Sequence, residues 1–205
     1  NYNQINFTGS TPALWIGNHQ YTFYNSVDSL LAMGTTSSTY AALKNDLSMV
    51  GTTYNSSAIA QFSGTLDGLG HSIDGYTLSV STRGSHGFFG TLSGANISNL
   101  GLSNVLITST TQDIATGSYE YIGGLAGYVT TTGTGATNVG TTNLNGVWTT
   151  GSISKTAGTA TRAFFGGGLV GHQRYGTLNI DRSFSTMNIS QQGAGDSRYT
   201  VLGVG

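Results

Sequence analysis

Residues 144–154, LNGVWTTGSIS, align without a gap with residues 180–190, IDRSFSTMNIS. The segment 97–108, ISNLGLSNVLIT, follows the same pattern with one extra residue. Repeats of this kind are too short to bury their own apolar faces. They are stable only when they stack and equivalent residues form continuous internal ladders. The self-similarity therefore predicts a parallel β-solenoid, in which neighbouring coils lie about 4.8 Å apart.

The alignment of the repeats predicts which apolar side chains stack inside the solenoid. Three ladders follow from it: Ile97, Leu144 and Ile180; Leu102, Trp148 and Phe184; and Ile107, Ile153 and Ile189. An exposed Trp148 would suit a platform on which a sugar ring stacks, but its alignment with Leu102 and Phe184 favours an interior position. We therefore expect Trp148 to be buried.

Glycine-rich segments mark one corner of each coil. GFFG ends at Gly90, GGLAG at Gly127 and GGGLVG at Gly171, and VLGVG at Gly205 matches a truncated fourth copy. Glycine recurs at such a corner because the backbone turns there with no room for a Cβ. Equal offsets from these glycines predict one more buried ladder, formed by Phe88, Leu125 and Leu169.

The landmark glycines are further apart than compact coils require, so we expect expanded loops at the corner before each glycine-rich strand. These corner loops occupy residues 81–87, 109–121, 155–163 and 191–199, and a further Thr- and Gly-rich loop occupies residues 130–142. Arg83 and Glu120 lie equally far before their landmark glycines, which predicts that they pair across adjacent coils. Aromatic and charged residues in or beside the corner loops are our candidate ligand contacts: Tyr119, Glu120, Tyr121, Arg162, Arg198 and Tyr199.

Composition supports an all-β fold and argues against several classes of function. Gly, Thr, Ser and Asn make up half of the 205 residues, and only 7% are charged, which disfavours helices and suits half-buried strands. A net charge of −1 without a basic stripe argues against nucleic-acid binding. No apolar run approaches the ~20 residues that insertion into a membrane requires. The absence of cysteine rules out disulfides and thiolate metal sites, and we expect no metal or other cofactor.

The N-terminal part differs from the repeats. Residues 13–24 are typical of two strands joined by a turn, and residues 25–34 are typical of a short helix with a polar cap and a glycine stop. We expect this helix to cover an end or flank of the stack. Residues 1–59 then lead into the coils of residues 60–205, within one continuous domain that we expect to be a segment of a longer protein.

Asp67 and His71 stand four positions apart in GTLDGLGH, where they could serve either catalysis or a turn. We favour the turn, because an Asp accepts backbone N–H bonds there, flanking glycines permit a positive φ, and a His can bond a carbonyl of the next coil. A glycosidase would need two carboxylates about 5–9 Å apart. No Asp–Asp pair and no G-x-S-x-G nucleophile element occurs. We therefore expect a protein that is not an enzyme.

Several of these motifs form an ordered series along the chain: FSGTLDGLGHSIDGYTL (62–78), GFFGTLSGANISNLGLSNVLIT (87–108), YIGGLAGYV (121–129) and GGGLVG (166–171). From about Tyr21 to Gly205, the chain resembles the large filamentous-haemagglutinin-type exoproteins of Gram-negative bacteria that carry GLUG repeats. The resemblance implies a right-handed parallel β-helix and export by an outer-membrane transporter of the two-partner-secretion type. It also implies a role in adhesion or surface structure.

We expect the chain to act in adhesion, as a secreted segment at the bacterial cell surface. Its corner loops would be displayed to a receptor or glycan on a host or neighbouring cell. A purely structural stalk, or a segment that associates end to end into filaments, is the first alternative. A carbohydrate-active β-helix enzyme is the second.

Overall fold

The structure is a computed structural model that describes residues 4–7, 13–33, 39–111, 119–130, 140–156, 164–192 and 200–201. These residues form short strands and one helix, α1 (Val27–Leu31), which confirms the all-β prediction. Among the described residues no helix is long and apolar enough to span a membrane. The strands form four sheets, which we number 1 to 4.

Sheets 1 and 2 have seven strands each, and sheets 3 and 4 have four. Sheet 1 has the order β1 (Leu14–Ile16), β2 (His19–Tyr24), β3 (Tyr40–Leu43), β7 (Thr65–Asp67), β12 (Asn96–Ser98), β16 (Thr141–Asn145) and β20 (Thr177–Asp181). Sheet 2 has the order β4 (Leu47–Ser48), β8 (Ser72–Asp74), β13 (Gly101–Ser109), β17 (Trp148–Thr156) and β21 (Phe184–Gln192), with β5 (Thr53–Tyr54) on β9 (Thr77–Val80), which joins β13. Sheet 3 has the order β6 (Ile59–Phe62), β11 (Phe89–Ser93), β15 (Ala126–Thr130) and β19 (Val170–Gln173). Sheet 4 has the order β10 (Ser85–His86), β14 (Glu120–Gly123), β18 (Phe164–Gly167) and β22 (Thr200–Val201).

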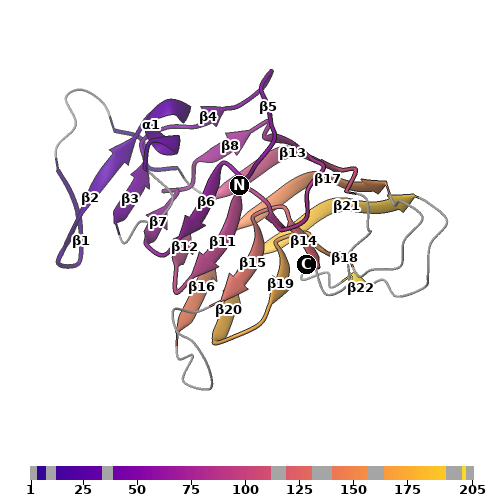
Figure 1. Ribbon diagram of the computed structural model, residues 1–205. Helices are drawn as coiled ribbons and strands as arrows, with labels where there is room; N and C mark the ends of the chain where they lie inside the picture. Colours follow the sequence, from indigo (N-terminus) through magenta and orange to yellow (C-terminus); the bar gives the residue numbers. More distant parts are fainter. Residues whose placement is uncertain are drawn as a thin grey trace.

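From β6 onward the chain visits the four sheets in a fixed order. It passes through sheets 3, 1, 2 and 4, and makes this passage four times: β6 to β10, β11 to β14, β15 to β18 and β19 to β22. We call each passage a round. Every pair of described strands is parallel except the hairpin β1–β2, which makes sheet 1 mixed. Figure 1 shows successive rounds side by side, from purple at β6 to yellow at β21.

Equivalent apolar residues of successive rounds stack inside the molecule. Strand register confirms two of the ladders predicted from the repeats: Ile97, Leu144 and Ile180; and Ile107, Ile153 and Ile189. The ladder predicted from the glycine-rich segments is confirmed as fully buried: Phe88, Leu125 and Leu169. Full burial of such a side chain contributes about 1.5–3 kcal/mol to stability, and the half-buried Ile180 and Ile189 contribute less, so the ladders hold the rounds together.

The prediction that Leu102, Trp148 and Phe184 form a buried ladder is wrong. Trp148 lies opposite Gly101, and Leu102 lies opposite Thr149. The extra residue of this repeat forms a bulge in β13 just after Leu102, whereas the alignment placed it earlier. Trp148 is therefore half-buried on the outer face, above Gly101. Its ring is parallel to that of the exposed Phe184, with 6.4 Å between centroids and 12° between planes.

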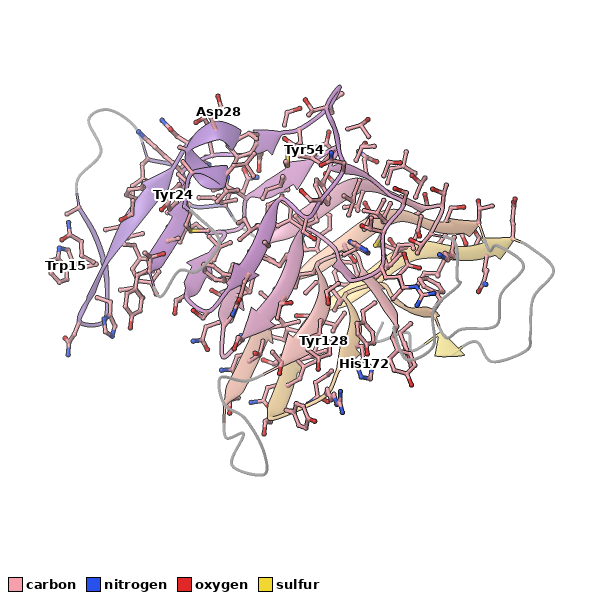
Figure 2. The ribbon with its side chains drawn as sticks, viewed as in Figure 1. Trp15, Tyr24, Asp28, Tyr54, Tyr128 and His172 are labelled. Carbon is pink, nitrogen blue, oxygen red and sulfur yellow. The ribbon has the colours of Figure 1, made fainter. Side chains whose placement is uncertain are left out.

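The N-terminal strands and helix form one end of the stack, as predicted. Ser26 caps α1, because its Oγ accepts a hydrogen bond from the Ser29 N–H and its own N–H donates to the Ser29 Oγ. Leu30 is the buried residue of this helix. Sheet 1 continues from β2 through β3 to β7, so the N-terminal part and the rounds share one sheet. Figure 2 shows Trp15 and Asp28 at this end of the molecule.

The predicted corner loops connect the same two sheets in every round, but their predicted ends are too late: β10 lies inside the range 81–87, and β14 begins inside the range 109–121. The chain passes from β9 to β10, from β13 to β14, from β17 to β18 and from β21 to β22, each time from sheet 2 to sheet 4. The predicted loop at 130–142 lies between β15 of sheet 3 and β16 of sheet 1. The central parts of the later loops lie outside the described residues.

Candidate functional site

Aromatic side chains gather where sheet 4 adjoins sheet 3. Tyr121 of β14 lies opposite Phe165 of β18 on sheet 4. Tyr128 of β15 lies opposite His172 of β19 on sheet 3. We call these four side chains the aromatic array. Tyr119 lies at the edge of the array and is the most exposed of the five residues, at 46%.

The rings of the array contact one another across the two sheets. The Tyr121 ring stacks on His172, with 4.7 Å between centroids, and on Tyr128, with 5.1 Å between centroids. The Phe165 ring is tilted against the His172 ring, with 4.9 Å between centroids, and against the Tyr121 ring, with 5.4 Å between centroids. Tyr119 meets Phe165 edge-on at 5.8 Å. Aromatic pairs of this kind contribute about 0.5–1.5 kcal/mol beyond area burial, so the array stabilises its own arrangement.

Glycine allows sheets 3 and 4 to approach closely enough for these rings to meet. A Cβ on Gly123 of β14 would lie 2.7 Å from the backbone N of Gly171. A Cβ on Gly171 would lie 2.7 Å from backbone atoms of Ile122. The segments GGLAG and GGGLVG are rich in glycine because the two backbones are in direct contact there. Larger residues would separate the two halves of the array.

On one side the array borders short polar side chains. In the preceding round, Ser85 lies opposite Tyr121 and Thr91 lies opposite Tyr128. The exposed Gln61 lies opposite Thr91 one round earlier. Aromatic rings therefore adjoin hydroxyl and amide groups. This mixture suits a ligand with both apolar faces and many hydroxyl groups.

Figure 2 shows Tyr128 and His172 close together on neighbouring strands, at a distance from Trp15 and Asp28. The charged side chain that acts on the array is Arg174. Burial, and then Arg174, lower the pKa of His172, so this imidazole is neutral at pH 7. Burial raises the pKa of Tyr121, and Arg174 partly opposes that effect. The array is thus an uncharged aromatic surface with one cation beside it.

Glu120, predicted as a ligand contact, points into the molecule and is 5% exposed. Its Oε1 accepts hydrogen bonds from Ser109 Oγ at 2.5 Å and from Thr111 Oγ1 at 2.9 Å. Its Oε2 lies 2.7 Å from the Nζ of Lys155, which is also buried. Since side chains alternate along a strand, the inward Glu120 turns the tyrosines on either side of it outward. Glu120 is therefore a positioning residue, and its carboxylate is not available to a ligand.

The other predicted contacts divide into two groups. Tyr119 and Tyr121 lie at the array, as described above. The remaining three lie outside the described residues: Arg162, Arg198 and Tyr199. The register expected for Arg83 and Glu120 is wrong by one residue, because Ser85 lies opposite Tyr121 and so places Gly84 opposite Glu120.

Three members of the array are not among the residues predicted from the sequence: Tyr128, Phe165 and His172. A signal for them is present. Tyr121 and Phe165 each lie six residues before a landmark glycine, and Tyr128 and His172 each follow one directly. Apolar periodicity predicts only inward-facing ladders, whereas these aromatic residues form an outward-facing ladder.

Asp67 and His71 serve the scaffold, as predicted. The Asp67 Oδ1 accepts hydrogen bonds from the Leu69 N–H at 2.8 Å and from the Asn99 Nδ2 at 3.0 Å. Leu69 adopts a positive φ of 51° in this turn. The buried His71 places its Nε2 3.1 Å from the carbonyl oxygen of Ile5, so the carbonyl belongs to the N-terminal segment and not to the next round.

Other surfaces offer fewer groups than the array. Trp15 on the β1–β2 hairpin is 60% exposed, and the pair Trp148 and Phe184 lies on sheet 2. On the hairpin side, His19 stacks on Tyr40 with 3.9 Å between centroids, and Tyr21 lies 5.4 Å from the same ring, so three rings meet there, compared with four in the array. In the part of the chain that the structure describes, no group of three His, Cys, Asp or Glu side chains could hold a metal ion.

Comparison with known proteins provides no relative. No family model, no curated protein and no solved structure matches this chain. Its function is therefore inferred from the aromatic array and the strands that carry it.

Proposed function

We propose that this chain acts in adhesion, as a stiff scaffold that presents the aromatic array to a receptor glycan without performing catalysis. The observation that carries the proposal is the array itself: four rings from four strands of two sheets lie within stacking distance at the surface. Clustered apolar groups at a protein surface mark interaction sites. Rings next to hydroxyl and amide side chains can hold the apolar face of a sugar and bond its hydroxyl groups.

We also propose that the scaffold is a right-handed parallel β-helix in which each round is one coil. Four passages through the same four sheets, with parallel register, support this architecture. The right hand is the one that parallel crossover connections adopt almost without exception. The motifs shared with filamentous-haemagglutinin-type exoproteins favour a secreted protein at the bacterial surface, exported by an outer-membrane transporter of the two-partner-secretion type.

Binding at the array would follow from rigidity. The buried Glu120–Lys155 pair and the stacked rings hold Tyr121 in one orientation before a ligand arrives. A preorganised surface loses little conformational entropy on binding, which favours recognition of flexible glycans. The corner loops that adjoin sheet 4 would then add contacts specific to one receptor.

The matched test replaces array residues by those that the preceding round carries at the same register. The double variant Tyr121→Ser, Tyr128→Thr should lose binding on a glycan array and adhesion to glycan-bearing cells. The control Trp148→Ala, Phe184→Ser removes a comparable aromatic pair from sheet 2 and should bind normally. Full binding by the first variant, or loss confined to the control, would rule out the array as the adhesive surface.

A structural stalk is the second candidate, and two observations favour it. The last strands of sheets 1 and 2 carry half-buried apolar residues: Leu178, Ile180, Met187 and Ile189. On sheet 1, the Asn143 Nδ2 donates to Asn96 Oδ1 at 2.7 Å, and the Asn179 Nδ2 donates to Asn143 Oδ1 at 2.9 Å. Such ladders suit continued stacking. Concentration-dependent end-to-end association that Ile180→Lys abolishes, together with no glycan binding, would favour the stalk.

An enzymatic role is the third possibility and is tested directly. The purified protein would be incubated with a panel of polysaccharides, and the products would be separated by size. Release of oligosaccharides would overturn both the adhesion and the stalk proposals.

A further inference from the structure

Arg174 places a cation beside the aromatic array. It directly follows β19, the strand that carries His172. Its backbone N–H donates to the carbonyl oxygen of Val129, the neighbour of Tyr128, at 3.2 Å. The Arg174 side chain is exposed, and its guanidinium carbon lies 5.0 Å from the centroid of the Tyr175 ring. Tyr128 and His172, the two array residues on sheet 3, therefore both lie close to Arg174 along the strands.

The described part of the chain does not neutralise Arg174. Two carboxylates in the described part of the chain are paired with other cations. Glu120 is paired with Lys155, and Asp181 lies 3.1 Å from Arg182. Arg174 forms no ion pair within the described residues, and its guanidinium lies over the aromatic face of Tyr175. An uncompensated guanidinium next to stacked rings is complementary to a ligand that combines an apolar face with an anion.

Resting on the proposed glycan binding, we propose that the ligand of the array is a saccharide that carries a carboxylate, such as a uronic or sialic acid residue. Its sugar rings would lie against Tyr121 and Tyr128, with Ser85 and Thr91 at one edge of the array to bond hydroxyl groups and Arg174 at the opposite edge. Its carboxylate would reach Arg174, whose planar guanidinium can form two parallel hydrogen bonds to the two oxygens.

The first test compares each acidic saccharide with its own neutral form. Oligogalacturonate, a hyaluronan fragment and sialyllactose would be titrated into the protein by calorimetry, each beside the same compound with its carboxylates reduced to alcohols. At least one acidic probe should bind about tenfold or more tightly than its reduced partner, because a charge-assisted hydrogen bond is lost on reduction. The preference should weaken as salt is added.

The second test assigns the preference to Arg174. The variant Arg174→Gln should bind the acidic and reduced forms of the same saccharide equally. The control Arg182→Gln makes the same change in net charge at an exposed ion pair and should keep the wild-type preference. Circular dichroism and thermal unfolding would show that both variants are folded.

The outcomes separate this inference from the proposed function. If the acidic and reduced forms bind equally and Tyr121→Ser abolishes both, the array binds glycans but the inference is overturned. If Arg182→Gln removes the preference as fully as Arg174→Gln, net charge and not Arg174 is responsible, and the inference is again overturned. If none of the six probes binds at millimolar concentration, both the inference and the glycan-binding proposal are overturned.

Discussion

The Nζ of Lys155 lies 2.7 Å from the Oε2 of Glu120, and both side chains are buried inside the stack of strands. Lys155 comes from β17 of sheet 2, and Glu120 comes from β14 of sheet 4. The pair therefore connects sheets 2 and 4 at the corner where the corner loops leave the strands. Removing two charges from water is costly, so an unpaired member of this pair would be more harmful than the loss of both.

Lys155→Met should lower the free energy of unfolding by about 3–5 kcal/mol, because it leaves the Glu120 carboxylate buried without its cation. The double variant Glu120→Gln, Lys155→Met should recover most of this loss, since Gln can still accept the hydrogen bonds of Ser109 and Thr111. The free energy of unfolding of the wild type, the single variant and the double variant would be measured by urea titration. A double variant no more stable than the single one would show that the pair is not the source of the effect.

A second prediction concerns Gly101 and Trp148, which lie opposite each other on sheet 2. A Cβ on Gly101 would overlap the Trp148 indole. Gly101→Ala should therefore destabilise the protein by about 1–3 kcal/mol. The same substitution in a Trp148→Ala background should cost much less, because the overlapping ring is gone. Equal costs in the two backgrounds, measured by thermal unfolding, would contradict the outward position of Trp148.

Gly101 and Trp148 also show which part of the fold could be predicted from the sequence and which part could not. Apolar periodicity located the ladder of Ile97, Leu144 and Ile180 correctly, because burial selects apolar residues at each repeat. It did not locate the one-residue bulge after Leu102, because an earlier placement aligns Leu102 with the apolar Trp148, whereas in the structure Leu102 lies opposite the polar Thr149. The structural signal is Asn104, whose φ of 52° marks the bulge, and Asn tolerates that conformation better than most residues.

The candidate site was predictable only in part, for two physical reasons. The inward position of Glu120 depends on Lys155, which lies far along the chain, and no local pattern reveals such a partner. The aromatic array is an outward-facing ladder, so burial does not constrain its residues to be apolar. Only the fixed offsets of the four array residues from the landmark glycines carry that information.

A third prediction concerns Tyr76, which is fully buried. Its hydroxyl donates to the carbonyl oxygen of Gly87 at 3.0 Å and accepts from the Ala58 N–H at 3.2 Å, and burial raises its pKa. Tyr76→Phe should cost about 1–3 kcal/mol, because it leaves two backbone groups without this partner. Tyr54→Phe, at a half-exposed neighbouring ring, is the matched control and should change stability by less than about 0.5 kcal/mol. Equal stability of the two variants in urea would contradict the assigned hydrogen bonds.

A fourth prediction concerns pH. Burial lowers the pKa of His86, although its Nε2 lies 2.8 Å from the carbonyl oxygen of Thr82, which opposes the effect. The unfolded chain therefore takes up this proton more readily than the folded protein. The contribution of neutral His86 to stability is complete above about pH 6.5 and is lost as the pH falls toward the folded pKa.

His86→Gln should accordingly flatten the loss of stability between about pH 8 and about pH 5. The free energy of unfolding would be measured by urea titration across this range for the variant and the wild type. His172→Gln provides a comparison, because burial also lowers the pKa of His172, but that side chain is more exposed. A pH profile of His86→Gln that parallels the wild type would show that His86 does not contribute.

The central claim is that glycans bind at the aromatic array and not at another aromatic surface. NMR spectroscopy distinguishes these surfaces in one titration, because each contains an aromatic side chain with an assignable signal. When a glycan that binds the protein is added, the ring signals of Tyr128 and His172 should shift, while the indole N–H signals of Trp15 and Trp148 should not. Shifts confined to Trp15 or Trp148, with Tyr128 and His172 unchanged, would contradict the account.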